Sequence, residues 1–399
     1  MRVGISGLAV GHPTGLGRLS RTYLLALAEA APDWELCVYF RNRHQFAQLS
    51  DELAGAGAAV PANIRPYFPP LAVLNRLLME ELDLPRQFGH LELDAYLGCD
   101  FTLPRKKLAP RELVVLPDLL PFTKPSTVGW RARLLYRTGI RRSIARQAVL
   151  LCISPHTKDA LDRLFPHHGC QTPVIMPALS PRLLALAQGQ HGADVPLQVR
   201  GSLHAVTSPG PFLLSVGVLG PRKNTELLVN LYQRLVLEDK YHGSLVLAGG
   251  DGSFHTAPDE RRLAFTTINP VPPQERGQTP AIYDLGRVSD HDLSRLYRDA
   301  DLLISLSAEE GFGYPVIEAL AHGTPALVTA GSSMAGIAEG GIAATELEPA
   351  RCYQRLVSTL NALPLLRKEA AGIICEDYSS ERLGRQLRAA VVGEPVPPR

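Results

Sequence analysis

The chain has 399 residues, of which 45% are hydrophobic and 20% charged, and its formal net charge is +2. This composition is ordinary for a soluble globular protein, and the length predicts two domains, or at most three. The small net charge excludes a global electrostatic attraction to nucleic acid. No stretch of about 18 consecutive apolar residues occurs, so we expect no transmembrane helix.

The first residues, Met1–Gly7, lack the long apolar run of a signal peptide and are typical of an opening strand. The six cysteines are scattered, with no CxxC pair and no metal-ligand spacing. We therefore expect reduced thiols, no bound metal and a cytoplasmic protein.

Short apolar runs alternate with helical patterns along nearly the whole chain. In the first half, the expected strands are Arg2–Ile5, Leu36–Phe40, Ala95–Leu97, Leu113–Leu116 and Val149–Ile153. In the second half, they are Phe212–Val216, Ser244–Ala248, Leu302–Ser305 and Ala326–Val328. Continuous apolar runs separated by amphipathic helices predict parallel sheets that are covered on both faces.

The pattern stops and starts afresh around residues 179–210, where turn-forming residues predict a linker. We expect two doubly wound domains and a terminal helix, with boundaries at residues 1–180, 181–208 (linker), 209–378 and 379–399. A cleft between two such domains is a natural small-molecule site, because each sheet presents the carboxyl ends of its strands to it.

The most informative segment follows the expected strand Leu302–Ser305. A glycine turn, Gly311-Phe312-Gly313, leads into a short helix, so backbone amides at the helix start can face an anion. Glu310 before this turn and Glu318 inside the helix can accept hydrogen bonds from hydroxyl groups. Amides for phosphate together with carboxylates for sugar hydroxyls indicate a nucleotide-sugar site. A surface turn with two solvated glutamates is the weaker alternative.

A second glycine turn follows the expected strand Phe212–Val216. It contains Gly217, then the adjacent cations Arg222 and Lys223, and then Asn224 as the expected helix N-cap. Arginine can bind a diphosphate in a bidentate manner and lysine as a point charge, so the pair is suited to a departing nucleoside diphosphate without a metal ion. An ordinary solvated pair is the alternative.

The first expected strand also leads into a glycine turn, at Gly15 and Gly17, where a helix begins. Such a turn could contact the phosphates from across the cleft. It lacks the Gly-x-Gly-x-x-Gly pattern with a downstream acidic residue, so we expect no dinucleotide cofactor. We interpret His12 in this loop as an ordinary loop histidine.

In order and spacing, these segments resemble glycosyltransferase family 4 over essentially the whole chain. The segments that carry the resemblance are Gly15–Arg18, Val114–Pro121, Leu151–Ser154, Gly217–Asn224, Leu245–Gly250, Leu285–Asp290 and Glu310–Glu318. The resemblance implies a GT-B fold, an α/β arrangement of two doubly wound Rossmann-like domains that face each other across a cleft. It also implies metal-independent transfer with retention of anomeric configuration, an acceptor-side N-terminal domain, and a last helix that returns to that domain.

The resemblance also implies roles for single residues. Glu310 and Glu318 match the family's Glu-x7-Glu motif, by which Glu310 would face the donor sugar and Glu318 would bind the nucleotide ribose. Arg222 and Lys223 match the family's diphosphate-binding pair.

Further along, the backbone at Arg287 and Val288 matches the segment that holds the nucleotide base. Two positions depart from the family pattern. Pro117 precedes Asp118 where the family commonly has His-Asp, and Gly336 stands where a further Glu is usual. Asp118 remains available to contact sugar or acceptor. We interpret the departures as altered donor or acceptor recognition in preference to lost activity.

Two motifs resemble functional sites. Asp290-His-Asp292 resembles an Asp-x-Asp metal motif, but Ser289 three residues before Asp292 is typical of a helix cap, which we favour. The glycines from Gly249 to Gly252 either contact nucleotide or form a plain turn.

From Leu119 through Lys158 there is no acidic residue, and one expected helix contains six arginines: Arg131, Arg133, Arg137, Arg141, Arg142 and Arg146. A basic amphipathic helix can lie on an anionic membrane and gain roughly 1 kcal/mol per cation near the surface. Peripheral contact with the inner face of a membrane is therefore one hypothesis, and an ordinary packed helix with a solvated basic face is the other.

Together, these features predict a retaining hexosyltransferase. It would move a hexose-type sugar from a nucleotide diphosphate sugar to a saccharide or lipid-linked saccharide in cell-surface polysaccharide synthesis. The expected catalytic residues are Glu310, Asp118, Arg222 and Lys223, with no cofactor besides the donor substrate. The alternatives are a nucleotide-sugar epimerase, a sugar phosphorylase or a non-catalytic donor-binding subunit. The irregular stretch 252–280, either functional or mobile, is one of the loops on which donor and acceptor identity would depend.

Overall fold

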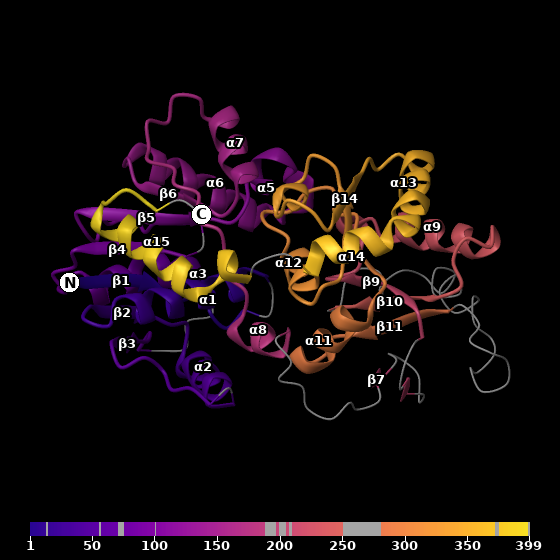
Figure 1. Ribbon diagram of the computed structural model, residues 1–399. Helices are drawn as coiled ribbons and strands as arrows, with labels where there is room; N and C mark the ends of the chain where they lie inside the picture. The colour runs from indigo at the N-terminus through magenta and orange to yellow at the C-terminus, as the bar shows by residue number, and fades with distance from the viewer. Residues whose placement is uncertain are drawn as a thin grey trace. The chain divides into compact units, whose positions relative to one another are not determined.

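The structure is a computed structural model of the chain (Figure 1). It describes residues 1–12, 15–55, 57–70, 76–99, 101–187, 197–198, 205–206, 210–249, 281–371 and 375–397. The chain divides into two compact units. The first unit comprises Met1–Ser180 together with Glu376–Arg399, and the second unit comprises Pro181–Cys375.

The first unit is built on a parallel sheet of six strands in the order β3-β2-β1-β4-β5-β6. Its strands are β1 (Arg2–Ser6), β2 (Glu35–Tyr39), β3 (Ile64–Tyr67), β4 (Ala95–Gly98), β5 (Arg111–Leu116) and β6 (Val149–Cys152). In the central strand, Val3 pairs with Leu36 on one side and with Ala95 on the other. The inner strands are buried along most of their length, because helices cover both faces of the sheet.

The helices of the first unit are α1 (Gly15–Ala30), α2 (Arg43–Gly55), α3 (Arg76–Leu78), α4 (Leu84–Phe88), α5 (Leu120–Thr123), α6 (Trp130–Ala145), α7 (Pro155–Leu164) and α15 (Ser380–Val392). A π-helical turn, Met79–Asp83, joins α3 to α4. Helix α15, yellow in Figure 1, packs on α1 through small residues, since a Cβ at Gly384 would lie 2.4 Å from the Ala26 carbonyl oxygen. Arg111 of β5 donates to the Ala390 carbonyl at 2.8 Å and ties α15 to the sheet.

The second unit repeats the same design with the strand order β11-β10-β9-β12-β13-β14, again all parallel. Its strands are β9 (Phe212–Val216), β10 (Ser244–Ala248), β11 (Ile282–Gly286), β12 (Leu302–Ser305), β13 (Ala326–Thr329) and β14 (Ile342–Thr345). Its helices are α8 (Pro181–Ala187), α9 (Thr225–Leu237), α11 (Asp290–Asp299), α12 (Tyr314–Ala321), α13 (Pro349–Asn361) and α14 (Leu363–Ala371). A short antiparallel pair, β7 (Leu197–Gln198) and β8 (Ala205–Val206), belongs to the same unit.

The expected α/β fold with doubly wound parallel sheets is confirmed, and each of the nine expected strands is present. In the two six-stranded sheets, three strands were not predicted: β3, β11 and β14, which lie at sheet edges. β3 and β11 are only partly buried and contain Arg65 and Asp284, so they lack the continuous apolar run by which the other strands were found. The stretch 181–208, expected as a linker, begins with helix α8. The stretch 252–280 lies outside the described residues.

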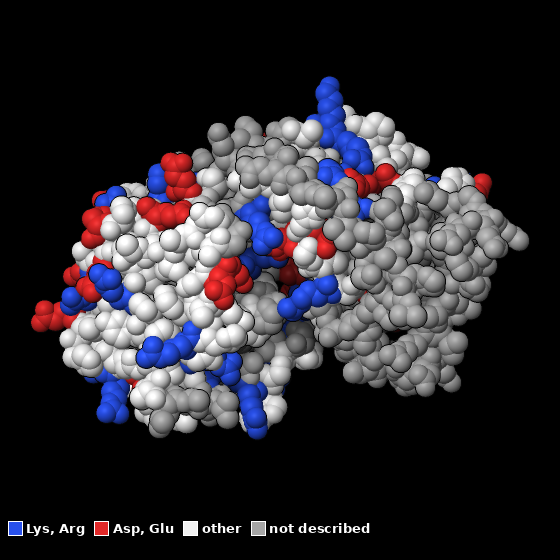
Figure 2. All heavy atoms as spheres, turned by 90° about the horizontal axis from the view of Figure 1, so that it is seen from below, with Lys and Arg blue, Asp and Glu red and all other residues white. Residues whose placement is uncertain are grey.

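Charges of both signs are interspersed on the face of the molecule shown in Figure 2, as the net charge of +2 implies. Among the helices that the structure describes, none is both long enough and apolar enough to cross a membrane.

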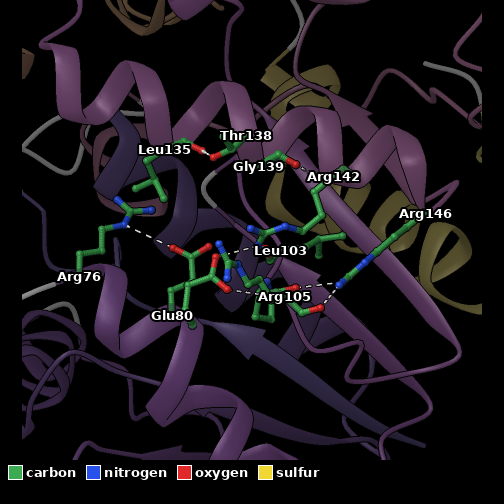
Figure 3. A network of polar contacts seen from close by, with 12 residues as sticks. Arg76, Glu80, Leu103, Arg105, Leu135, Thr138, Gly139, Arg142 and Arg146 are labelled. Carbon is green, nitrogen blue, oxygen red and sulfur yellow. Dashed lines mark hydrogen bonds and ion pairs between the residues drawn. The ribbon is translucent and has the colours of Figure 1, made fainter.

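The arginine-rich segment is helical as expected, but its arginines do not form one solvated face. Arg142 pairs with Glu81 at 2.8 Å, and Arg146 pairs with the buried Glu112 at 3.3 Å. Figure 3 shows Arg142 and Arg146 directed away from α6 toward the segment around Leu103. These cations hold neighbouring segments of the first unit together, so they are not available to a surface partner.

Two further arginines of α6 are half-buried, and both donate to backbone carbonyls: Arg137 to Pro121 at 2.7 Å and Arg133 to Pro125 at 3.2 Å. The exposed positions of the helix are Trp130, Arg131, Leu134, Thr138, Arg141 and Ala145. Apart from Arg131, they recur every three or four residues, so they form one stripe. The exposed positions of α6 thus include two of the six arginines, Arg141 on the stripe and Arg131 beside it.

Candidate active site

The strand order of the second unit determines where its chemistry can lie. Strand β9 is the first strand of this sheet, with β10 on one side and β12 on the other. The strand order reverses between β9 and β12, and open α/β sheets bind ligands outside the carboxyl ends of the strands at such a point. Both sequence motifs that indicate phosphate or sugar binding begin here, because one follows β9 and the other follows β12.

The turn after β9 depends on glycine. Gly217 has a φ of +136°, and a Cβ there would lie 2.9 Å from Cε of Lys223. Its amide donates to the Ala248 carbonyl at 2.8 Å, which fixes the turn against the end of β10. A side chain at this position would therefore displace Lys223 from the turn.

Asn224 joins the two motif loops. As expected, it is the N-cap residue of α9, although its side chain makes no capping hydrogen bond. Instead, its Nδ2 donates to the Leu306 carbonyl at 2.7 Å, and its backbone adopts a φ of +49°. The loop after β9 is thereby tied to the loop after β12. Thr225 closes the first loop, since its hydroxyl accepts from the Gly220 amide at 3.0 Å.

Glu310 receives three donors on one oxygen. Its Oε1 lies 2.8 Å from Nη1 of Arg222, 2.8 Å from Nζ of Lys223 and 2.8 Å from Oγ of Ser307. The side chains of Glu310 and Lys223 are 17% and 13% exposed, whereas that of Arg222 is 41% exposed. Burial disfavours the charged carboxylate, but the charges of Lys223 and Arg222 outweigh it and hold the pKa of Glu310 below its ordinary value.

The glycine turn at the start of α12 is tightly packed. Gly313 has a φ of +111°, and a Cβ there would lie 2.5 Å from Cγ of Met334. Ser333 fixes the turn, because its hydroxyl donates to the carbonyls of Glu310 at 2.6 Å and Phe312 at 3.1 Å. At the start of α12, Pro315 has no N–H and the Val316 amide donates to the Gly313 carbonyl at 3.0 Å, so the backbone that could approach an anion is that of the glycine turn itself.

Glu318 lies one turn further along α12 in a buried polar network. Its side chain is 1% exposed, and its Oε2 accepts from the Tyr297 hydroxyl of α11 at 2.7 Å. His322 contacts the Glu318 carbonyl through Nδ1 and the Ser294 hydroxyl through Nε2, both at 2.7 Å. Thr324 donates to the Tyr297 carbonyl and completes the link between the two helices. The carboxylate is thus held in one orientation.

The chain is similar in sequence to known glycosyltransferases. Residues 204–345 match the family model described as "Glycosyl transferases group 1". The O-antigen chain mannosyltransferase B of Escherichia coli is 26% identical over 322 residues, which cover 78% of this chain and 77% of that protein. The matched segment, residues 204–345, is thus similar to the group 1 glycosyltransferases, and the similarity to the mannosyltransferase extends over most of the chain.

Solved structures agree on the fold of this glycosyltransferase. The structure of HepE from Anabaena in complex with UDP and glucose superposes with a TM-score of 0.63 at 16% identity, over 98% of this chain and 100% of that one. WaaG, described as a glycosyltransferase involved in lipopolysaccharide biosynthesis, gives a TM-score of 0.59 at 15% identity, over 98% of each chain. The GT-B fold and the glycosyltransferase activity expected from the sequence are confirmed.

The base-binding segment expected in this glycosyltransferase follows the edge strand β11. Gly249 donates to the Gly286 carbonyl at 2.6 Å, so the ends of β10 and β11 are joined directly. Arg287 is exposed and Val288 half-buried beside this junction. Ser289 accepts from the Asp292 amide at 3.1 Å, so the helix-cap interpretation of this motif is confirmed.

The other expected site residues lie in the first unit. Asp118 is half-buried after β5, where its Oδ1 accepts from the Leu120 amide at 3.0 Å and fixes the start of α5. Gly15 is exposed at the start of α1, whereas Gly17 is buried, with the His12 carbonyl oxygen 1.9 Å from where its Cβ would lie. The functional roles predicted for these three residues stay predictions.

Several residues that position the site are not part of the predicted motifs. Ser307 lies three residues before Glu310, and a hydroxyl so close to a buried carboxylate could have been suspected from the spacing alone. Ser333 lies in the turn after β13 and donates to the Glu310 carbonyl, and Tyr297 lies in α11 and donates to Glu318. Both are distant in sequence from the residues they contact, so no local pattern could have found them.

Proposed function

We propose that this glycosyltransferase moves a hexose-type sugar from a nucleotide diphosphate sugar to a saccharide or lipid-linked saccharide, with retention of anomeric configuration and without a metal ion or other cofactor. The observation that carries the proposal is the convergence of Arg222 and Lys223 on Glu310 beside the glycine turn of α12. Two cations and a helix start are suited to a diphosphate, and a carboxylate next to them is suited to a sugar hydroxyl.

Each residue has a proposed role. Arg222 and Lys223 bind the diphosphate together with the amides of Gly311, Phe312 and Gly313. Glu310 accepts a hydrogen bond from the donor sugar. These residues belong to two loops that Asn224 ties together, so they are pre-positioned for one ligand.

The nucleoside is proposed to bind at the other loops of the same sheet edge. Glu318 accepts from the ribose, the backbone at Arg287 and Val288 binds the base, and Gly217 leaves room for Lys223. In the first unit, Asp118 is proposed to contact the acceptor.

The proposed reaction breaks the bond between the anomeric carbon and the diphosphate oxygen, and the diphosphate leaves with the electron pair. The acceptor hydroxyl oxygen forms the new bond to the same carbon, and its proton passes to the departing phosphate oxygen. Arg222 and Lys223 stabilise the negative charge that develops on that oxygen. No separate general base is required.

The relatives support a particular class of substrate. The Escherichia coli relative is named an O-antigen chain mannosyltransferase, which supports mannose as the sugar and a cell-surface polysaccharide as the product. The Anabaena structure contains UDP and glucose, which supports a nucleoside diphosphate at the corresponding loops. Donor identity therefore needs a direct measurement.

A thermal-shift screen tests the donor. The purified chain is heated with mannose, glucose and galactose, each linked to uridine or guanosine diphosphate. We expect one nucleotide sugar to raise the melting temperature by several degrees, since a ligand that binds only the folded state stabilises it by mass action. If no nucleoside diphosphate or nucleotide sugar changes the melting temperature, the proposed donor site is wrong.

Variants then test the site and separate the alternatives. With the donor from the screen and a saccharide acceptor, Glu310→Gln and Arg222→Ala should each slow transfer strongly, whereas Glu309→Gln should not. An epimerase would convert the donor without any acceptor, and a phosphorylase would require inorganic phosphate. A binding subunit would bind the donor and transfer nothing until a second chain was added.

A peripheral membrane contact through α6 is a second proposal. Trp130 and Leu134 are 64% and 60% exposed and lie one turn apart on the exposed stripe, with Arg131 stacked 5.1 Å over the indole ring. Arg131 and Arg141 would add roughly 1 kcal/mol each near an anionic surface, about 2 kcal/mol in total. The apolar pair would enter the interface while the two cations bind headgroups.

Sedimentation with liposomes tests this contact. We expect the chain to sediment with anionic vesicles and not with zwitterionic ones, and the double variant Trp130→Ala/Leu134→Ala to lose binding. Leu164→Ala, which changes another exposed leucine of the first unit, is the matched control. Equal binding by the double variant and the control would contradict the proposal.

A further inference from the structure

The cations assigned to the donor diphosphate already have an anionic partner within the protein. Arg222 Nη1 and Lys223 Nζ both lie 2.8 Å from the same oxygen of Glu310. These are charge-assisted distances, and the carboxylate is only 17% exposed, so water screens the contact weakly. The Glu310 carboxylate therefore lies where a phosphate would have to lie to contact both cations.

The side chain of Glu310 can leave this position without a change in the loop. Its backbone is fixed, because Ser333 donates to the carbonyls of Glu310 and Phe312. The cations are attached to a separate loop that Asn224 holds in place. Rotation of the Glu310 side chain alone would therefore free both cations for another anion.

We propose that Glu310 is an internal competitor of the diphosphate, one that discriminates the intact donor from the spent nucleoside diphosphate. This inference rests on the proposed function. When an intact nucleotide sugar binds, its diphosphate displaces the carboxylate from Arg222 and Lys223, and the sugar hydroxyls give the carboxylate a replacement partner. The spent nucleoside diphosphate has no sugar, so Glu310 has no second partner and returns to the cations. The carboxylate thereby weakens product binding more than donor binding and speeds product release.

Inorganic pyrophosphate is the first probe, because it has neither base nor sugar. Its affinity is measured by isothermal titration calorimetry at one pH and one salt concentration for the parent and for Glu310→Gln. The amide keeps the size of the side chain and removes the competing charge, so we expect Glu310→Gln to bind pyrophosphate about tenfold more tightly or better. Glu309→Gln also removes one carboxylate charge, at the neighbouring residue, and its affinity for pyrophosphate should stay within about twofold of that of the parent.

Nucleoside diphosphate and intact donor form the second comparison. UDP, GDP and the nucleotide sugar found in the thermal-shift screen are titrated into the same variants. Glu310→Gln should tighten binding of the nucleoside diphosphate and leave donor binding unchanged or weaker, so the ratio of the two affinities shifts toward the product. If Glu310→Gln misfolds, Ser307→Ala should give a smaller change in the same direction, because it keeps the competing charge but removes a donor that holds the carboxylate near the cations.

The outcomes separate this inference from the proposed function. If the parent and Glu310→Gln bind pyrophosphate equally, or if Glu309→Gln shows the same gain, the competition is overturned while the donor site stands. If neither the parent nor Glu310→Gln binds any diphosphate, the anion site itself fails. A larger gain for the donor than for the nucleoside diphosphate would also overturn the proposed discrimination.

Discussion

The two units have the same strand order, yet the loops at their central strands differ in what they contact. In the second unit, the loops after β9 and β12 bring Arg222 and Lys223 onto Glu310. In the first unit, the loop after β1 closes on its own backbone, where Gly17 lies against the His12 carbonyl. Each of the two doubly wound sheets therefore offers a ligand position at its central strands, but the side chains there determine what each position can bind.

Gly17 in the first unit and Gly217 in the second are required for different reasons. At Gly17, an added Cβ would meet a backbone oxygen at 1.9 Å, which cannot rotate away. At Gly217, an added Cβ would meet Cε of Lys223 at 2.9 Å, a flexible side chain. The first glycine is required for packing, and the second leaves space for a cation. The comparison can be tested by changing each unit separately.

The largest expected effect is on transfer by Lys223→Ala. Loss of one preorganised cation at a developing negative charge costs on the order of 100- to 1000-fold in kcat. Transfer is measured under single-turnover conditions with the donor identified by thermal shift. Lys240→Ala, an exposed cation of the same unit, is the control and should leave the rate unchanged. A loss below about threefold would mean that Lys223 is not part of the transfer site.

Gly17→Ala should destabilise the first unit. The contact with the His12 carbonyl is severe, so we expect a cost of about 3 kcal/mol, the upper end for overpacking. Hydrogen exchange of the α1 amides reports the stability of this unit directly. At Gly15 a Cβ meets nothing within 4 Å, so Gly15→Ala is the matched control. Equal exchange in the two variants would show that the loop relaxes at little cost.

Much of this comparison could be predicted from the sequence. Inner strands are apolar along their whole length, and glycine turns follow them, so the sheets and the switch point were recognisable. The pairing of Glu310 with Arg222 and Lys223 could be suspected because adjacent parallel strands end at the same edge. The edge strands β3 and β11 were missed, because Arg65 and Asp284 interrupt their apolar pattern.

The rest depends on contacts between distant segments. Asparagine is a common N-cap residue, and the sequence does not show that the Asn224 side chain donates to the Leu306 carbonyl. Arg142 and Arg146 look like surface cations in the sequence, but Glu81 and Glu112 lie far away in the chain and pair with them. Local pattern cannot reveal such partners.

Tyr297→Phe should weaken nucleotide binding by roughly tenfold, because the buried carboxylate of Glu318 loses its hydroxyl donor and the orientation that this bond imposes. Affinity for the nucleoside diphosphate is measured by calorimetry. Tyr232→Phe is a close control, since Tyr232 is equally buried in the same unit and its hydroxyl donates to the Gly243 and Ala281 carbonyls. We expect both variants to lose stability, but only Tyr297→Phe to lose affinity. Equal affinity for the nucleoside diphosphate in the two variants would mean that Tyr297 contributes to stability and not to nucleotide binding.

The smallest expected effect is the pH dependence of the second unit. The pKa of Glu310 lies below its ordinary value of 4.5, so the unfolded chain takes up this proton more readily than the folded one. The stability that its ion pairs contribute is fully present above about pH 4.5 and is lost as the pH falls through the folded-state pKa. In thermal melts between neutral pH and pH 3, Glu310→Gln should therefore lose less stability on acidification than the parent. Glu309→Gln should follow the parent, and parallel curves for all three would mean that the cations do not stabilise the Glu310 carboxylate.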